Sequence, residues 1–212
     1  MRKKSHLSLA GYLIKVDREN IIRYGIFFRF GSLEPDLIPT FITTKHRIDL
    51  TLPKLERLMH RTLCNFDPEQ GITPLMAARL GVITHYTADY FTFPHNLEYP
   101  GSMAGHIHYE ELLKRRFREF VRESLESGSL YLEERPVKSI ADVIGYIKKE
   151  HAVYLHSKSE YDFEEGERAI EEDCEFIIRI CTNVIGSILY LAHISAAAAA
   201  GTVRMSGSTA HL

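Results

Sequence analysis

The chain has 212 residues and a net charge of −2 with its histidines neutral; 45% of its residues are hydrophobic and 25% are charged. These values are typical of one globular domain that can bury a sizeable core. The absence of a basic excess argues against a dedicated nucleic-acid-binding protein. The three cysteines form no paired motif; Cys174 and Cys181 are interpreted as buried thiols, which suits a reducing compartment.

The N-terminal segment starts with Met1 and three basic residues, as a signal peptide does. Its apolar run, residues 7–14, is short, charged residues then interrupt it, and no small-residue cleavage site follows. We therefore interpret the segment as a mature N-terminus and expect a cytoplasmic protein. The spacing of apolar residues predicts a helix over 6–17 with Ser5 as its cap.

The next segment combines a second helix with a long loop. Residues 20–30 are rich in isoleucine and phenylalanine and predict a largely buried helix that Gly31-Ser32 should end. Residues 32–50 contain two prolines and little periodicity, so we expect a loop, and long ordered loops are often functional. A helix over 52–64 follows. The loop contains three side chains of interest: Asp36, His46 and Asp49.

Residues 72–93 are apolar nearly all round, which predicts a central helix. His85 and Asp89 are four positions apart and therefore share one face of it. Both are costly to bury without partners. A metal ion would satisfy both side chains; a neutral, hydrogen-bonded His–Asp pair is the alternative. Pro94 disfavours helix at the residue before it and should leave His95 just past the helix end.

The C-terminal half is predicted to be helical with few interruptions. A loop over 95–104 leads to a helix over 105–127 that carries a second His/carboxylate pair at helical spacing, His106 and Glu110. The lysine and arginines that follow are interpreted as a charged outer face. Further helices are predicted over 137–157 and 163–195.

The end of the chain raises the question of a membrane span, because residues 181–200 are strongly apolar. Polar residues within the stretch favour an interior helix, so we expect no transmembrane segment. The helix should end near Gly201, with 199–212 as a flexible tail. The sequence therefore predicts an all-α fold, a bundle of about seven helices in one domain over 1–198.

Eight side chains of metal-ligand type follow one another in the order of a known family. A single His-x3-acid pair is weak evidence, because one or two such pairs arise by chance in a chain with this many histidines and acids. His85-x3-Asp89-x5-His95 reproduces, without a gap, the core motif of the zinc-dependent phospholipase C family, and His106-x3-Glu110 reproduces its downstream motif. The chain resembles this family, whose wider superfamily includes the P1-type nucleases, over about residues 5–120. The full series is His6, Asp36, His46, His85, Asp89, His95, His106 and Glu110.

The resemblance implies a helical bundle that binds two or three Zn²⁺ ions per chain. Four side chains would hold the first ion: Asp36, His46, His85 and Asp89. Three would hold the second and leave a position open for water or substrate: His95, His106 and Glu110. A third ion would lie beside the first, bridged by Asp89, with two further ligands: His6 and the α-amino group of Met1. An α-amino group titrates near pH 8, so zinc could deprotonate it.

One departure from the family bears on the third site. In the family, residue 1 is a Trp whose amino group is a ligand; here the first residue is Met1 and the chain contains no Trp. The alternative is therefore that the N-terminus frays and only two zinc ions bind. Asp49 has two interpretations of its own: it could orient a ligand histidine, or cap the helix that follows.

The resemblance implies a zinc-dependent phosphodiester hydrolase of phospholipase C type, in which zinc-bound hydroxide attacks phosphorus. Asp36 would act as ligand, general base or both. Choline-hydrolysing members place aromatic residues where this chain has Leu37 and Thr43, which makes a choline cage doubtful. The substrate is therefore a phosphodiester, with a phospholipid headgroup as one candidate and nucleic acid less expected. The alternatives are a P1-type nuclease or nucleotidase and a metal-stabilised scaffold without catalysis; the oligomeric state stays open.

Overall fold

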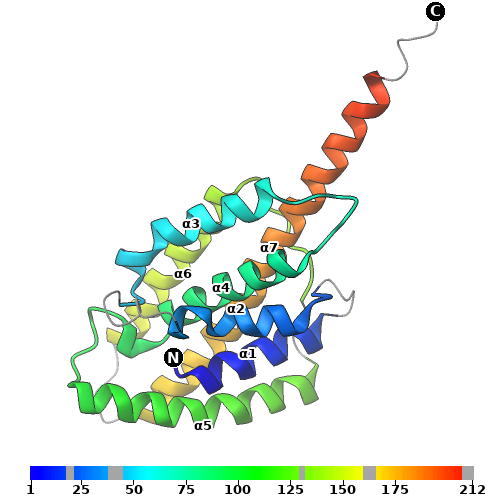
Figure 1. Ribbon diagram of the computed structural model, residues 1–212. Coiled ribbons are helices and arrows are strands. Elements are labelled where there is room, and N and C mark those ends of the chain that lie inside the picture. The colour runs from blue at the N-terminus through cyan, green and yellow to red at the C-terminus, as the bar shows by residue number, and fades with distance from the viewer. Residues whose placement is uncertain (18–21, 38–44, 129–131, 160–165, 207–212) are drawn as a thin grey trace, which may run out of the picture.

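The computed structural model describes residues 1–17, 22–37, 45–128, 132–159 and 166–206. Over these ranges the chain forms α-helices, one short 3₁₀ helix and no strand, which confirms the all-α prediction (Figure 1). The elements, in chain order, are α1 (Lys3–Val16), α2 (Gly25–Leu37), α3 (Ile48–Cys64), α4 (Pro74–Tyr90), η2 (Phe93–His95), α5 (Met103–Ser127), α6 (Ile140–Ser159) and α7 (Gly166–Ser206).

Helix α4 is the centre of the bundle, as its all-round apolar sequence predicts. Thr73 caps it by accepting a hydrogen bond from the backbone nitrogen of Met76, and Pro74 occupies the first turn, where its missing N–H costs nothing. Its second half is almost wholly buried, and α1, α2, α3 and α7 pack around it (Figure 1). A polar side chain on this half can therefore be met from several helices at once.

Helix α2 extends farther than its sequence indicates, to Leu37 rather than to Phe30. Gly31 does not break the helix because it is a contact point: a Cβ atom added there would overlap the carbonyl oxygen of Ala78 on α4. Gly81 makes the corresponding contact from α4, because a Cβ atom added there would overlap the carbonyl oxygen of Phe28 on α2. The two glycines let the backbones of α2 and α4 approach closely. The predicted loop over 32–50 is thus wrong for residues 32–37 and 48–50, and residues 38–44 lie outside the described ranges.

Helices α1 and α5 run alongside each other and form one side of the bundle (Figure 1). Helix α1 begins at Lys3, so Ser5 is buried within its first turn and is not the cap that its sequence predicts. Helix α5 begins where Ser102 accepts a hydrogen bond from Gly105 N, and it ends at Gly128, whose φ of 59° is a left-handed conformation that favours glycine.

Helix α7 continues to Ser206, beyond the end predicted near Gly201, and its C-terminal part extends past the other helices (Figure 1). Cys174 and Cys181 are buried free thiols on it, as predicted. Its segment Arg168–Ser195 is long and apolar enough to cross a membrane. Within this segment, 72% of an apolar 18-residue stretch is buried inside the bundle. A core helix of a soluble protein has the same properties.

Candidate metal centre

The nine ligand-type groups predicted from the sequence converge at one end of α4. The elements that carry them are far apart in the sequence: α1 carries His6, α2 carries Asp36, α4 carries His85 and Asp89, and η2 carries His95. Three more side chains and the Met1 α-amino group complete the set: His46 lies just before α3, His106 and Glu110 lie on α5, and Met1 precedes α1. Among the described residues, the eight side chains form three groups whose ligand atoms lie within 4.8 Å of one another.

The first group surrounds the Nε2 atom of His85. This atom lies 3.0 Å from His46 Nδ1 and 3.2 Å from Asp89 Oδ2, and the last two atoms are 2.9 Å apart. Asp36 stands slightly back, with Oδ1 3.8 Å from His85 Nε2 and 3.9 Å from His46 Nδ1. Separations of this size suit atoms that each lie about 2 Å from a shared zinc ion. These are the four residues predicted for the first zinc site.

The backbone of α2 fixes the tautomer of His85. Its Nδ1 donates a hydrogen bond to the carbonyl oxygen of Ser32, 2.9 Å away, within the fully buried interface between α2 and α4. The other ring nitrogen, Nε2, is then free to bind a metal, which is the usual arrangement for a ligand histidine. Sequence analysis missed Ser32, and no sequence signal could reveal it, because the acceptor is a main-chain atom.

The second group lies at the start of α5. Glu110 Oε1 is 3.1 Å from His95 Nε2 and 3.5 Å from His106 Nε2, and all three side chains are partly exposed. The four-residue spacing of His106 and Glu110 places them on one face of α5, as predicted. Helix η2 positions His95, which faces Asp89 through Nδ1 at 3.6 Å and so connects this group with the first one.

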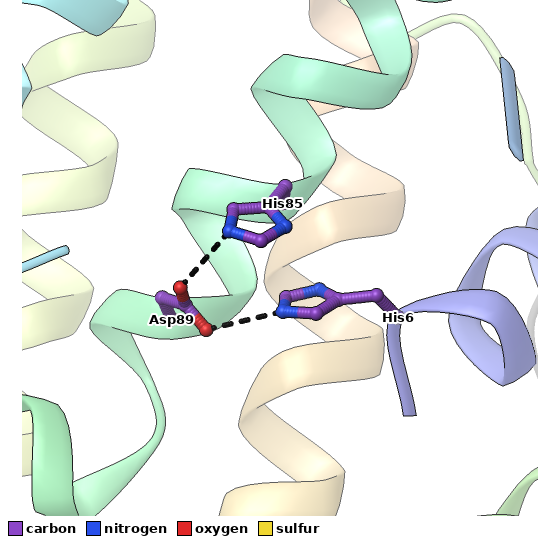
Figure 2. A group of neighbouring side chains, drawn as sticks. All are labelled: His6, His85 and Asp89. Atoms are coloured by element: carbon purple, nitrogen blue, oxygen red, sulfur yellow. Dashed lines mark ion pairs between the residues drawn. The ribbon is translucent and has the colours of Figure 1, made fainter. Parts of the chain in front are cut away.

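The third group joins α1 to α4 through His6, His85 and Asp89. Figure 2 shows the rings of His6 and His85 stacked, with Asp89 beside both. The centroids of the two rings are 3.9 Å apart, and the ring planes differ by 17°. His6 Nε2 lies 3.3 Å from Asp89 Oδ1. Neither ring nitrogen of His6 makes a hydrogen bond to a described residue, although the side chain is fully buried. Such a group is costly unless something binds it, so a metal ion fits this position.

The α-amino group of Met1 is buried among the same side chains. Its nitrogen lies 2.6 Å from Asp89 Oδ1, 2.8 Å from His95 Nε2 and 3.2 Å from Glu110 Oε1. It therefore lies between the second and third groups, closer to His95 and Glu110 than the sequence-based assignment to the third site implied. The fraying alternative does not describe this structure, because Met1 is only 4% exposed.

Burial and charge act against each other across the cluster. Burial lowers the pKa of the Met1 amine and raises that of Asp89, but their mutual attraction outweighs it, so the pKa of the amine is raised and that of Asp89 lies well below its ordinary value. Burial and the neighbouring His85 lower the pKa of His6 to about 3. Burial and the Met1 ammonium lower the pKa of His95 as well. Neutral imidazoles beside a carboxylate are the protonation states that a metal site requires.

A cleft of about 1020 Å³ opens over the cluster. Asp36, His46, His95, His106 and Glu110 line it, whereas His6, His85 and Asp89 are buried and are not among its lining residues. Its rim carries six basic residues: Arg2, Lys3, Lys4, Lys45, Arg47 and Lys114. The prediction that the basic residues of α5 form only an outer face is wrong for Lys114, which lines the cleft one helical turn beyond Glu110.

A buried polar network that the sequence did not reveal holds the turn before His95. Asp173 of α7 is fully buried and accepts hydrogen bonds from the backbone nitrogen of Phe93 at 3.1 Å and from Tyr154 at 2.7 Å. Lys158 compensates its charge at 2.8 Å. The side chain of Asn96 bonds back to carbonyl oxygens of the same turn. An isolated Asp or Asn carries no pattern that would predict these contacts.

Two minor predictions have clear outcomes. Asp49 lies in the first turn of α3 and pairs with Arg47 at 3.0 Å, so among its described contacts none orients a ligand histidine. His108, two positions after His106 on α5, is exposed and belongs to none of the three ligand groups.

Comparison with known proteins gives one match. A family model described as zinc-dependent phospholipase C matches residues 5–161, which include every ligand-type side chain of the cluster. No curated protein and no solved structure matches the chain.

Proposed function

Because the chain belongs to the zinc-dependent phospholipase C family, we propose that it is a zinc-dependent hydrolase of phosphodiesters. The observation that supports this most directly is the convergence of three His/carboxylate groups beneath one open cleft. Bound zinc would supply an activated water molecule and positive charge next to the phosphate. Without such ions the buried ring nitrogens of His6 make no hydrogen bond to a described residue.

The proposed ligands are those that the sequence predicts, with Asp89 shared between sites. Asp36, His46, His85 and Asp89 hold the first ion. His95, His106 and Glu110 hold the second. His6, Asp89 and the Met1 α-amino group hold the third, and the position of the amine beside His95 and Glu110 also brings it within reach of the second.

Asp36 is the proposed general base. It stands farther from the histidines of its group than Asp89 does, and it lines the cleft while Asp89 is buried behind it. Burial raises the pKa of Asp36, which moves it toward the range in which a carboxylate accepts a proton effectively. In the reaction, a water oxygen bonds to phosphorus and the bond from phosphorus to the leaving oxygen breaks. Asp36 takes the proton from water, and the leaving oxygen receives a proton in turn.

The test is hydrolysis of bis(p-nitrophenyl) phosphate by the zinc-loaded protein. We expect Asp36→Asn to lower kcat by about 10²–10⁴-fold, the usual contribution of a general base, while the protein keeps its fold by circular dichroism. Glu126→Gln, which changes an exposed carboxylate at the far end of α5, is the matched control and should leave kcat unchanged. A zinc-loaded protein that hydrolyses neither this ester nor a single-stranded oligonucleotide would favour the non-catalytic scaffold.

A further inference from the structure

The rim of the cleft carries six basic side chains, whereas the scissile phosphodiester has a single negative charge. Its six lysines and arginines come from three separate segments: the start of α1, the residues just before α3, and α5. The whole chain is slightly acidic, with a net charge of −2, so this concentration of cations is local. Bound metal ions would add to it.

Three of these six side chains form ion pairs with described residues, and three do not. Arg2 and Lys114 pair with Glu111, at 2.7 Å and 2.5 Å. Arg47 pairs with Asp49. Lys3, Lys4 and Lys45 are exposed, and no described residue forms an ion pair or a hydrogen bond with their ammonium groups.

Lys3 and Lys4 are also unfavourable for the helix that carries them. They occupy the first turn of α1, which contains no acidic residue. The N-terminal end of a helix carries partial positive charge and favours acidic side chains, so two lysines there weaken the helix. Their position is understandable if an anion binds beside them, because an anion interacts favourably with both the lysines and the helix end.

Among its described residues, the cleft has few of the aromatic side chains that recognition of choline or of nucleic-acid bases requires. A choline cage needs several aromatic rings around the cation, and a nucleic-acid site needs aromatic platforms for base stacking. Apart from its histidines, Tyr99 is the one aromatic residue among the described lining residues. A quaternary ammonium group would meet lysines instead. The cleft does expose two apolar side chains, Leu97 and Met103, which suit the acyl part of an amphiphilic substrate.

We infer that Lys3, Lys4 and Lys45 bind a second anionic group on the headgroup of the substrate, so that the preferred substrate is an acidic phospholipid with a phosphate or carboxylate beyond its scissile phosphodiester. This inference rests on the proposed phosphodiester hydrolysis and specifies its substrate class. The role of the lysines is binding, and the reaction at phosphorus stays as described above.

The experiment compares short-chain phospholipids with identical acyl groups and three headgroups: choline, inositol and inositol 4-phosphate. For the zinc-loaded protein we expect kcat/KM to be about tenfold or more higher with inositol 4-phosphate than with choline, because complementary charge raises binding and encounter. Replacing Lys3, Lys4 and Lys45 together by Gln should remove that preference and leave choline-lipid hydrolysis within about twofold. The matched control replaces three exposed lysines outside the cleft, Lys138, Lys148 and Lys149, and should preserve it.

Calorimetry provides a readout that does not depend on turnover. Inositol 1,4-bisphosphate should bind the zinc-loaded protein more tightly than phosphocholine, and the Lys→Gln triple variant should lose the difference. Equal hydrolysis of choline and inositol 4-phosphate lipids, or equal binding of the two headgroups, would overturn the inference and leave the proposed hydrolase in place. If no phosphodiester is cleaved, the proposed function fails, and calorimetry still decides whether the lysines bind a second anion.

Two further arms separate the alternative sources of that anion. Deacylated glycerophosphoinositol 4-phosphate should be cleaved more slowly than the lipid; equal rates would contradict a lipid substrate. Preferential cleavage of a single-stranded oligonucleotide over every lipid would replace the inference with a nuclease activity.

Discussion

The α-amino nitrogen of Met1 lies 2.6 Å from Asp89 Oδ1, across 88 positions of sequence. The contact is buried, and it brings the chain terminus into the same cluster as His6, His95 and Glu110. An amine in that place either neutralises the carboxylate as an ammonium or, once deprotonated, binds a metal that Asp89 also binds. The proposed third site rests on the second state.

Extending the chain before Met1 tests that site. A Gly-Ser extension turns the amine into an amide, whose nitrogen has no lone pair available for zinc. The added residues must also pass through a position that is buried in the wild-type protein. We expect the extended protein to bind one zinc ion fewer per chain and to hydrolyse phosphodiesters more slowly. A C-terminal extension of equal length is the control. Equal zinc content and equal rates in both proteins would contradict a role for the Met1 amine.

Gly81→Ala should destabilise the protein because a methyl group there overlaps the backbone of α2. We expect the free energy of unfolding to fall by about 1–3 kcal/mol, as overpacking usually costs. Because α2 carries Ser32 and Asp36, zinc affinity should fall too. Gly145→Ala is the matched control on α6, where a methyl group meets nothing, and it should stabilise by about 0.5–1 kcal/mol. Thermal unfolding and zinc titration measure both effects; unchanged zinc affinity in Gly81→Ala would show that the α2–α4 contact does not position the site.

Asp173→Asn should loosen the turn that carries His95. It leaves the buried Lys158 ammonium without its closest carboxylate, and removing one partner of a buried ion pair costs about 3–5 kcal/mol. Tyr154→Phe removes one hydrogen bond to the same carboxylate, so a loss of about 0.5–1.5 kcal/mol is expected. Denaturant unfolding measures both. An Asp173→Asn protein of wild-type stability would show that Glu172, which also contacts Lys158, is sufficient.

The histidines of the cluster should make the metal-free protein acid-sensitive. The pKa of His6 is about 3 in the folded chain and near 6.5 when the chain unfolds. Between these values the unfolded state binds the extra proton, so the free energy of unfolding falls as pH falls, by about 1.4 kcal/mol per pH unit for one such group. His95, whose pKa is also lowered, acts in the same direction. Urea unfolding at several pH values should show a shallower dependence for His6→Asn; an unchanged slope would contradict the assignment.

The sequence was sufficient for the architecture, which rests on local periodicity, and for the members of the cluster, which the resemblance to a known family supplied. The four-residue spacing of His85 and Asp89 on an apolar helix carries its own geometry. The extent of α2 was not predictable, since whether Gly31 ends a helix or allows close packing depends on Ala78 of another helix. The roles of the Ser32 carbonyl, the buried Asp173 and the cleft lysines likewise could not be predicted, because each depends on residues that are distant in the sequence and close in the fold.

The most direct test of the metal centre is the zinc content of the untagged protein, purified without added metal and measured by elemental analysis. We predict two or three zinc ions per chain, with a marked loss in Asp89→Asn, because Asp89 touches all three groups. Glu126→Gln should keep the full content. Little or no zinc in the wild-type protein, with none restored by dialysis against zinc, would contradict the account and leave a helical scaffold whose buried histidines bind no metal.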